Sequence, residues 1–297
     1  MHTSVLLNEV LGVLNPRPGQ IFIDATVNGG GHARVIAEKV GEKGKVIGID
    51  WDCELVRESG IRNQELGIRN TTFVCDTYVN IGAIARKFRV AGKVDGVLFD
   101  LGFSSYHTER SGRGFTFLKD EPLDMRYNIE GGGLTAETIV NSWAQDAIEE
   151  SIRRFGEDHF SKKIAAAIVA ARKEKRVTRT AALADIVRRA IPARARGNRI
   201  HPATRTFQAL RIAVNKELEN IEAGLDGAYT VLKKGGVIAA ISFHSLEDRI
   251  VKEAFRAYEK RERATRLTKK PIIASYPEVR ENPRARSAKL RALKKIE

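Results

Sequence analysis

The sequence has no long hydrophobic run and no basic region ahead of an apolar one at its start. Its longest apolar runs, such as Gly236–Ile241, are far shorter than the roughly 18 residues that a membrane span needs. The opening MHTSVLLNEV does not have the pattern of a signal peptide. These absences exclude the usual membrane and secretory classes, so we expect a cytoplasmic protein with no membrane partner.

Cysteine is scarce, with only Cys53 and Cys75, and their spacing matches no metal-binding or redox motif. In a cytosolic protein this predicts two reduced thiols. Cys-x-x-Cys and His-x-x-x-His spacings are absent as well. The sequence therefore indicates no structural metal, and we expect none.

Acidic residues are too few to balance the basic ones, and the formal net charge is +14. Residues 1–107 are neutral, with 12 basic and 12 acidic side chains, whereas residues 108–205 carry 19 and 13. Residues 256–297 carry 14 basic and 5 acidic side chains. A basic central segment and a basic tail indicate a polyanionic partner such as nucleic acid. Composition alone leaves open that the charge serves only solubility.

Short apolar runs alternate with helical patterns in the first third of the chain. The four runs are residues 21–27, 45–50, 71–76 and 94–102. Such alternation predicts an α/β fold, with a doubly wound, mostly parallel sheet and helices on both faces. A fifth run follows at residues 235–245, after apolar residues at helical spacing from Phe207 to Leu225 that predict one long helix.

The fourth and fifth runs are separated by 138 residues, counted from Asp100 to Ile238. A crossover in a parallel sheet takes only about 30 residues, and a structureless loop of the remaining length is implausible. We infer an inserted, all-helical domain at residues 108–205. It divides the main domain into a first part, residues 1–107, and a second part with the basic tail, residues 206–297.

A glycine-rich turn, residues 28–32 (NGGGH), follows the first predicted strand, and Asp50 ends the second. In doubly wound folds an acidic residue at the second position accepts hydrogen bonds from ribose hydroxyls, which fits dinucleotides and S-adenosylmethionine alike. The turn lacks the Gly-x-Gly-x-x-Gly spacing of dinucleotide sites, which favours S-adenosylmethionine. Asp24 is then suited to the amino and sulfonium groups of that cofactor. A tight turn without a ligand is the alternative.

Asp100 ends the fourth predicted strand, at the sheet edge where doubly wound folds bind ligands. The lone pair of an exocyclic base amine is delocalised into the ring, so a hydrogen-bond acceptor beside the amine makes it more reactive. Asp100 is a candidate for that catalytic acceptor, or for a contact to the cofactor. Phe103 follows it, and is placed either to stack on a base or to join the core.

Several longer motifs occur together along nearly the whole chain. They are HTSVLLNEV from His2, GGGH from Gly29, DLGFSS from Asp100, GRGFTF from Gly112, PLDMR from Pro122, FGEDHFSKKIA from Phe155, HPATRTFQALRIAVNKELE from His201, ISFHSLEDRIVK from Ile241 and ENPRARSAKLR from Glu281. Together they resemble the family of ribosomal RNA small subunit methyltransferase H. The resemblance implies a class I methyltransferase domain, Rossmann-like, with a helical insertion.

The resemblance also implies an activity, which is the transfer of a methyl group from S-adenosylmethionine to N4 of a cytidine. The target would lie in the decoding region of small-subunit ribosomal RNA, so that RNA or the ribosomal subunit is the expected partner. The cofactor contacts implied by similarity are Gly30, Gly31, His32, Asp50, Tyr78, Asp100 and His107. We add Asp24 from the turn, and we predict the substrate-side residues Phe103, Ser104, Asp124 and His244.

The chain departs from the family pattern at two of these positions. Asn28 stands where the family usually has Gly, and Asn is the residue that next best tolerates a left-handed backbone. Tyr106 and His107 stand where it usually has Pro-Gln, so His107 would have to make the contact that Gln makes in the family. Two substrate candidates have structural alternatives, because Asp124 can pair with Arg126 and His244 can make a loop hydrogen bond.

A rival interpretation from another functional class is a non-catalytic RNA-binding factor of ribosome assembly that keeps a cofactor pocket. The basic insertion and tail fit both interpretations. No motif in the sequence specifies an oligomeric state.

Overall fold

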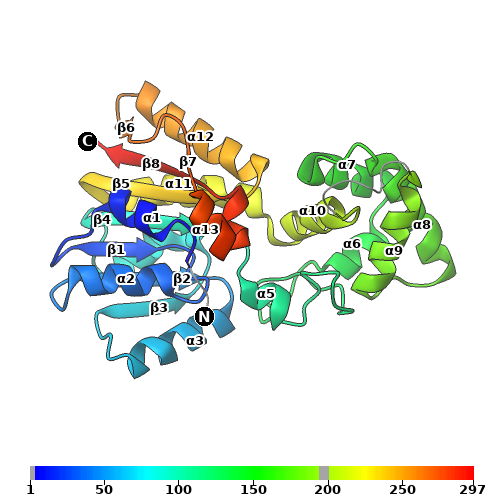
Figure 1. Cartoon of the computed structure of the whole chain (residues 1–297), viewed down its shortest axis with the longest axis horizontal. Coiled ribbons are helices and arrows are strands. Elements are labelled where there is room, and N and C mark those ends of the chain that lie inside the picture. The colour runs from blue at the N-terminus through cyan, green and yellow to red at the C-terminus, as the bar shows by residue number, and fades with distance from the viewer. Residues whose placement is uncertain (1–3, 194–200) are drawn as a thin grey trace. The chain divides into compact units, whose positions relative to one another are not determined.

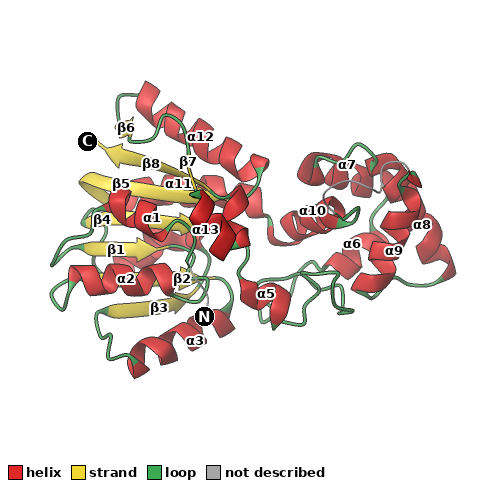
Figure 2. Ribbon diagram, in the orientation of Figure 1, coloured by secondary structure: helices red, strands yellow, loops and turns green. Residues whose placement is uncertain are grey.

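The structure of this chain, a computed structural model, describes residues 4–193 and 201–297. It consists of two compact units (Figures 1 and 2). One unit comprises the chain up to Ser104 together with Leu218–Glu297, and the other comprises Ser105–Glu217. His2 and Thr3 of the first motif lie outside the described residues.

The first unit is built on one sheet, and its five parallel strands are those that the apolar runs predict. They are β1 (Ile21–Asp24), β2 (Lys45–Asp50), β3 (Thr71–Cys75), β4 (Val94–Asp100) and β5 (Leu232–Ser242), in the spatial order β3-β2-β1-β4-β5. The tail adds antiparallel strands that we did not predict, β6 (Ala264–Arg266), β7 (Ile272–Ile273) and β8 (Lys289–Lys295). The prediction of an α/β fold with a mostly parallel sheet is confirmed.

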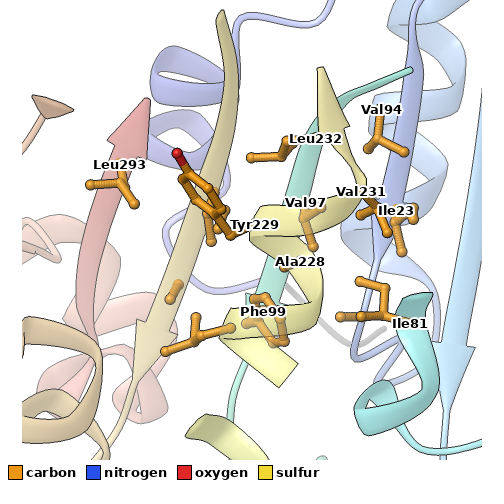
Figure 3. Packing of buried hydrophobic residues seen from close by; sticks show 14 of the residues in the cluster. Ile23, Ile81, Val94, Val97, Phe99, Ala228, Tyr229, Val231, Leu232 and Leu293 are labelled. Carbon is orange, nitrogen blue, oxygen red and sulfur yellow. The ribbon is translucent and has the colours of Figure 1, made fainter. Parts of the chain in front are cut away.

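Helices cover both faces of this sheet. They are α1 (Leu7–Leu14), α2 (Gly31–Val40), α3 (Cys53–Glu65), α4 (Ile81–Lys87), α11 (Glu217–Val231), α12 (Ser245–Lys260) and α13 (Tyr276–Glu281), with short 3-10 helices at Tyr78–Asn80 and Pro283–Ser287. Because side chains alternate along a strand, Phe22 packs against α1 and α2, and its neighbour Ile23 points to the opposite face. There it joins the core formed with α4, α11 and α12, part of which Figure 3 shows.

The second unit is helical. Its helices are α5 (Ser105–Glu109), α6 (Ala136–Ser142), α7 (Gln145–Gly156), α8 (Ser161–Glu174), α9 (Thr180–Ala190) and α10 (Thr204–Asn215). Helices α6 to α10 contribute to one apolar core, which includes Met125, Ile148, Ile164, Leu183 and Leu210. No helix in the described parts of the chain is both long and apolar enough to cross a membrane.

The prediction of one long helix from Phe207 to Leu225 is wrong. The chain forms α10 and α11 instead, and turns between them at Lys216, whose φ is 49°. The buried side chain of Asn215 explains the break, because its amide donates to the Met125 carbonyl at 2.8 Å and its oxygen accepts from the Tyr127 N–H at 2.9 Å. The helical spacing continues across the turn because each helix buries a face of its own.

The prediction of two reduced thiols is also wrong, since Cys53 and Cys75 are joined by a disulfide with their Cα atoms 5.0 Å apart. The sheet register brings them together. Cys75 at the end of β3 is aligned with Asp50 at the end of β2, and Cys53 starts α3 three residues after Asp50. A separation of 22 residues in sequence is thus a short distance across one β-α-β unit.

Candidate active site

Three aspartates end three neighbouring strands of the parallel sheet. Asp24 ends β1, Asp50 ends β2 and Asp100 ends β4. Because β1 lies between β2 and β4 in the sheet, the three side chains meet at one carboxyl edge. This is the edge at which open α/β sheets bind their ligands, and the structure thus brings together the three predicted acids.

Two of these carboxylates are buried without full hydrogen bonding. Asp24 Oδ1 accepts from the Thr26 N–H at 3.2 Å. Within residues 4–193 and 201–297, however, Asp24 Oδ2 and Asp100 Oδ1 have no hydrogen-bond partner. A buried polar atom without a partner destabilises a fold unless something else satisfies it. These oxygens therefore fit a ligand that carries positive charge and N–H donors.

Burial changes the acidity of the same groups. Burial raises the pKa of Asp24 well above its ordinary value, and the negative charges of Asp100 and Asp50 act in the same direction. Burial likewise raises the pKa of Asp100 to about 7, and the carboxylate of Glu247 in α12 adds to that effect. At neutral pH Asp100 is thus divided between its charged and neutral forms, and a cationic ligand would favour the charged one.

The glycine-rich turn is held between the tips of β2 and β4 by Asn28. Its backbone is left-handed, with φ at 46°, as we expected for an Asn in place of Gly. Its N–H donates to Asp50 Oδ2 at 2.9 Å, and its side-chain amide donates to the Asp100 carbonyl at 2.8 Å. Gly29 and Gly30 follow with φ of 96° and 79°, and α2 then begins at Gly31. The departure from the family pattern therefore adds a bond that glycine cannot make.

His32 in the first turn of α2 is buried and faces Asp100. Its Nδ1 is 3.7 Å from Asp100 Oδ2, and its Nε2 is 3.0 Å from the carbonyl oxygen of Val5. The structure thus places this predicted cofactor contact beside the predicted catalytic acid, a pairing that the sequence did not indicate.

Tyr78 lies three residues after the end of β3, where we expected an aromatic ring beside an adenine. Its ring meets that of Phe99 edge-on, with centroids 5.6 Å apart. It also lies against Gly224 of α11, where a Cβ atom would come within 2.5 Å of the ring. The missing side chain at Gly224 therefore makes room for Tyr78. The contact of Tyr78 with a cofactor stays a prediction.

Two substrate candidates follow β4 and one precedes α12. Phe103 is 40% exposed and therefore not a core residue, whereas Ser104 is buried. His244 caps α12, because its ring accepts from the Glu247 N–H, and the Glu247 carboxylate accepts from the His244 N–H at 3.2 Å. The loop hydrogen bond that we considered for His244 is present. Contact of any of the three with a substrate stays a prediction.

The other two predicted residues, His107 and Asp124, belong to the helical unit. The His107 ring packs against both Phe115 and Tyr127, with centroids 4.9 Å and 5.0 Å away. Asp124 accepts two hydrogen bonds from the Arg126 guanidinium, at 2.8 Å and 2.6 Å. Burial alone would raise the pKa of Asp124, but the bonds from Arg126 outweigh burial and hold it below its usual value. The ion pair that we considered is thus formed, and the ligand roles of both residues stay predictions.

Two residues that affect Asp100, Thr26 and Glu247, were not predicted from the sequence. Thr26 Oγ1 accepts from the Asp100 N–H at 2.6 Å, and the Glu247 carboxylate acts on the Asp100 charge. Glu247 lies inside the motif ISFHSLEDRIVK, so the motif itself was a signal that could have identified it. Thr26 follows Asp24 closely, but its role depends on the pairing of β1 with β4.

Comparison of sequences identifies the relatives of this chain. A sequence model described as the MraW methylase family matches residues 1–296. A protein of Heliobacterium modesticaldum, named ribosomal RNA small subunit methyltransferase H, is 44% identical over 99% of this chain and 98% of its own length. A protein of the same name from Symbiobacterium thermophilum is 42% identical over 100% and 97%.

Solved structures are less similar. The crystal structure of an rRNA methylase from Streptococcus thermophilus is 11% identical, covers 100% of this chain and 99% of its own, and has a TM-score of 0.48. NSun6 from Pyrococcus horikoshii, solved with SFG, is 14% identical over 99% of this chain and 53% of its own, also with a TM-score of 0.48. The assignment of this chain to a family therefore rests on the sequence matches.

Proposed function

This chain belongs to the MraW methylase family, and from that premise we propose that it methylates N4 of a cytidine in the decoding region of small-subunit ribosomal RNA. It is a methyltransferase of the same family as the curated ribosomal RNA small subunit methyltransferases H. Its cofactor is S-adenosylmethionine. Since ribosomal RNA is the proposed substrate, we place the protein in the cytoplasm with the ribosomal subunit as its partner.

The observation that supports the proposal most directly is the carboxyl edge with its unpartnered, buried oxygens. S-adenosylmethionine, when bound, supplies an electrophilic methyl group on a positively charged sulfur. Asp24 and Asp100 provide negative charge in a buried site, which fits the amino and sulfonium charges. Asp50 provides the acceptor for ribose hydroxyls, and the backbone at Gly30 and Gly31 allows close approach.

Asp100 has a second proposed role, as the acceptor of a hydrogen bond and then of a proton from the base amine. A cytosine amine is a poor nucleophile because its lone pair is delocalised into the ring. An ionised carboxylate that accepts a hydrogen bond from the amine N–H makes the lone pair more available. When the nitrogen gains its methyl group it must lose one proton, and the Asp100 carboxylate takes up that proton to become a carboxylic acid. This role requires the ionised form of Asp100, so methylation weakens as the pH falls through the pKa that Asp100 has in the complex with the cofactor. The positive charge of the bound cofactor should hold that pKa below the value of about 7 in the free protein.

The target base must leave its stack before the amine can reach this edge. Phe103, which is exposed and lies three residues after the end of β4, is the aromatic residue that we assign to the extruded base. The basic tail supports binding to RNA, because Lys and Arg side chains contact phosphates whatever the base sequence. Affinity for RNA should accordingly fall as the salt concentration rises.

The proposal is tested with small ribosomal subunits from cells that lack the protein, incubated with the purified enzyme and labelled S-adenosylmethionine. We expect label in RNA and, by mass spectrometry of the digested RNA, N4-methylcytidine at one position. Subunits from normal cells are the matched control and should accept little label, because their site is already modified. Binding of RNA and cofactor without any transfer would favour the assembly-factor interpretation, and another modified nucleoside would refute the assignment of N4.

A further inference from the structure

The N-terminal motif HTSVLLNEV has no part in the function proposed above, yet its segment lies directly on the glycine-rich turn. A Cβ atom at Gly31 would come within 2.1 Å of Ser4 Oγ. The Val5 carbonyl oxygen is 3.0 Å from Nε2 of His32. The segment therefore packs against the same residues that we assign to the cofactor and to Asp100.

The peptide bond between Val5 and Leu6 is held at both of its polar ends. Its carbonyl oxygen faces His32, and its N–H, which belongs to Leu6, donates to Glu278 Oε1 of α13 at 2.7 Å. Leu6 is fully buried and left-handed, with φ at 53°. For a leucine this conformation is unfavourable, and such a residue persists only where its surroundings impose it. Glu278, 272 residues away in sequence, is part of what imposes it.

The contact with Val5 determines which nitrogen of His32 carries the proton. A carbonyl oxygen can only accept a hydrogen bond, so Nε2 must be the protonated nitrogen. In the neutral ring Nδ1 then carries the lone pair, and Nδ1 is the atom that lies 3.7 Å from Asp100 Oδ2. At this distance the charge on either group affects proton binding by the other.

We propose that Glu278 and the Val5–Leu6 peptide are positioning groups that hold His32 in its Nε2–H form, and that His32 in turn sets the protonation of Asp100. The proposal deepens the function proposed above, because it rests on Asp100 being the acceptor for the amine. In this proposal the N-terminal motif and α13 of the tail both position His32 at the carboxyl edge.

The charged groups around His32 and Asp100 all change the affinity of these two residues for a proton in the same direction. Asp24 of β1 and Asp50 of β2 belong to the same acidic cluster, and Glu247 of α12 acts on Asp100. All three are carboxyls, so they increase the affinity of the His32–Asp100 pair for a proton. The Val5 carbonyl does the same, because it stabilises the doubly protonated ring of His32. Loss of the contact with Val5 should therefore weaken proton binding by the pair.

Two substitutions at one position separate the hydrogen bond from charge and packing. Glu278→Met keeps a chain of similar length but has no acceptor for the Leu6 N–H. Glu278→Gln removes the charge but keeps an acceptor oxygen. Glu281→Met is the matched control, since Glu281 is an exposed residue of the same helix.

The first measurement is nitrogen NMR of histidine-labelled protein without cofactor, with His32→Gln to assign the signal. We expect the Nε2–H form of His32 in the wild type, in Glu278→Gln and in Glu281→Met. We expect a mixture of the two neutral forms in Glu278→Met. An unchanged signal from His244, which caps α12 in the same unit, shows that the variant is folded. If Glu278→Met does not fold, the wild-type spectrum still decides, since a dominant Nδ1–H form overturns the proposal.

The second measurement is the pH dependence of kcat for methylation of small ribosomal subunits. In Glu278→Met the acidic limb should move to lower pH by about half a unit or more, and it should stay in place in the other two variants. The proposal is refuted if Glu278→Met matches the wild type in both measurements, or if Glu278→Gln behaves like Glu278→Met. Failure of the wild type to transfer methyl would refute the proposed function instead, and the NMR result would still decide the inference.

Discussion

In the unit built on the parallel sheet, Asp24 and Asp100 are buried with oxygens that have no hydrogen-bond partner among the described residues. In the unit of residues 105–217, by contrast, buried Glu217 accepts two hydrogen bonds from Arg211, at 2.8 Å and 3.0 Å. A carboxylate whose hydrogen bonds are all made within the protein stabilises the fold and has none left for a ligand. A buried carboxylate without such bonds lowers stability and is available to a ligand, so the contrast separates functional from structural acids.

The strongest test of this contrast is Asp100→Asn. The amide keeps the size of the side chain but cannot take up the proton of the amine. We expect the rate of methyl transfer to fall about a thousandfold while the unfolding midpoint does not decrease. Transfer rates and thermal unfolding of the same preparations measure both. A loss of activity together with a loss of stability would mean that Asp100 is structural after all.

A paired acid should respond in the opposite way. Arg211→Met leaves Glu217 buried without its partner, and removing one partner of a buried pair costs about 3 kcal/mol of unfolding free energy. The double variant Arg211→Met/Glu217→Met should recover most of that loss, because no unpaired charge remains. Denaturant unfolding measures all three proteins. Arg153→Met, in an exposed pair with Glu150, is the control and should change stability by less than about 0.5 kcal/mol.

Stability should also depend on pH through Asp100. Its pKa is raised to about 7 in the folded protein, so the folded state binds the proton more tightly than the unfolded state. The stabilisation is therefore complete below about pH 4 and is lost as the pH rises towards 7. Relative to Asp100→Asn, the wild type should lose about 4 kcal/mol over this range. Parallel pH profiles of the two proteins would contradict the assignment.

The smallest effect is expected at Asp124, which is partly exposed and paired with Arg126. Its pKa is lowered in the folded protein, so its contribution is present above the unfolded value near 4 and is lost as the pH falls through the folded value. We expect Asp124→Asn to cost about 1 kcal/mol at neutral pH, with solvent screening taken into account, and less in acid. The slope against pH thus has the opposite sign to that of Asp100. Equal slopes at the two aspartates would remove the contrast between the units.

The sequence by itself determined the features that depend on neighbouring residues. Apolar runs located all five parallel strands. The meeting of Asp24, Asp50 and Asp100 followed as well, because parallel strands place their carboxyl ends at one edge. Alternation and helical spacing are local, so they can be read without knowing which segments pair.

Only the tertiary structure decided the features that join distant segments. The Cys53–Cys75 disulfide needs the register of β2 with β3, and the break at Asn215 needs the carbonyl of Met125. The hydrogen bond from Leu6 to Glu278 joins the two ends of the chain. No local pattern encodes such contacts, because each depends on how separate elements pack. The protonation of His32 beside Asp100 is therefore a property of the folded molecule, and the sequence reveals only that both residues are present.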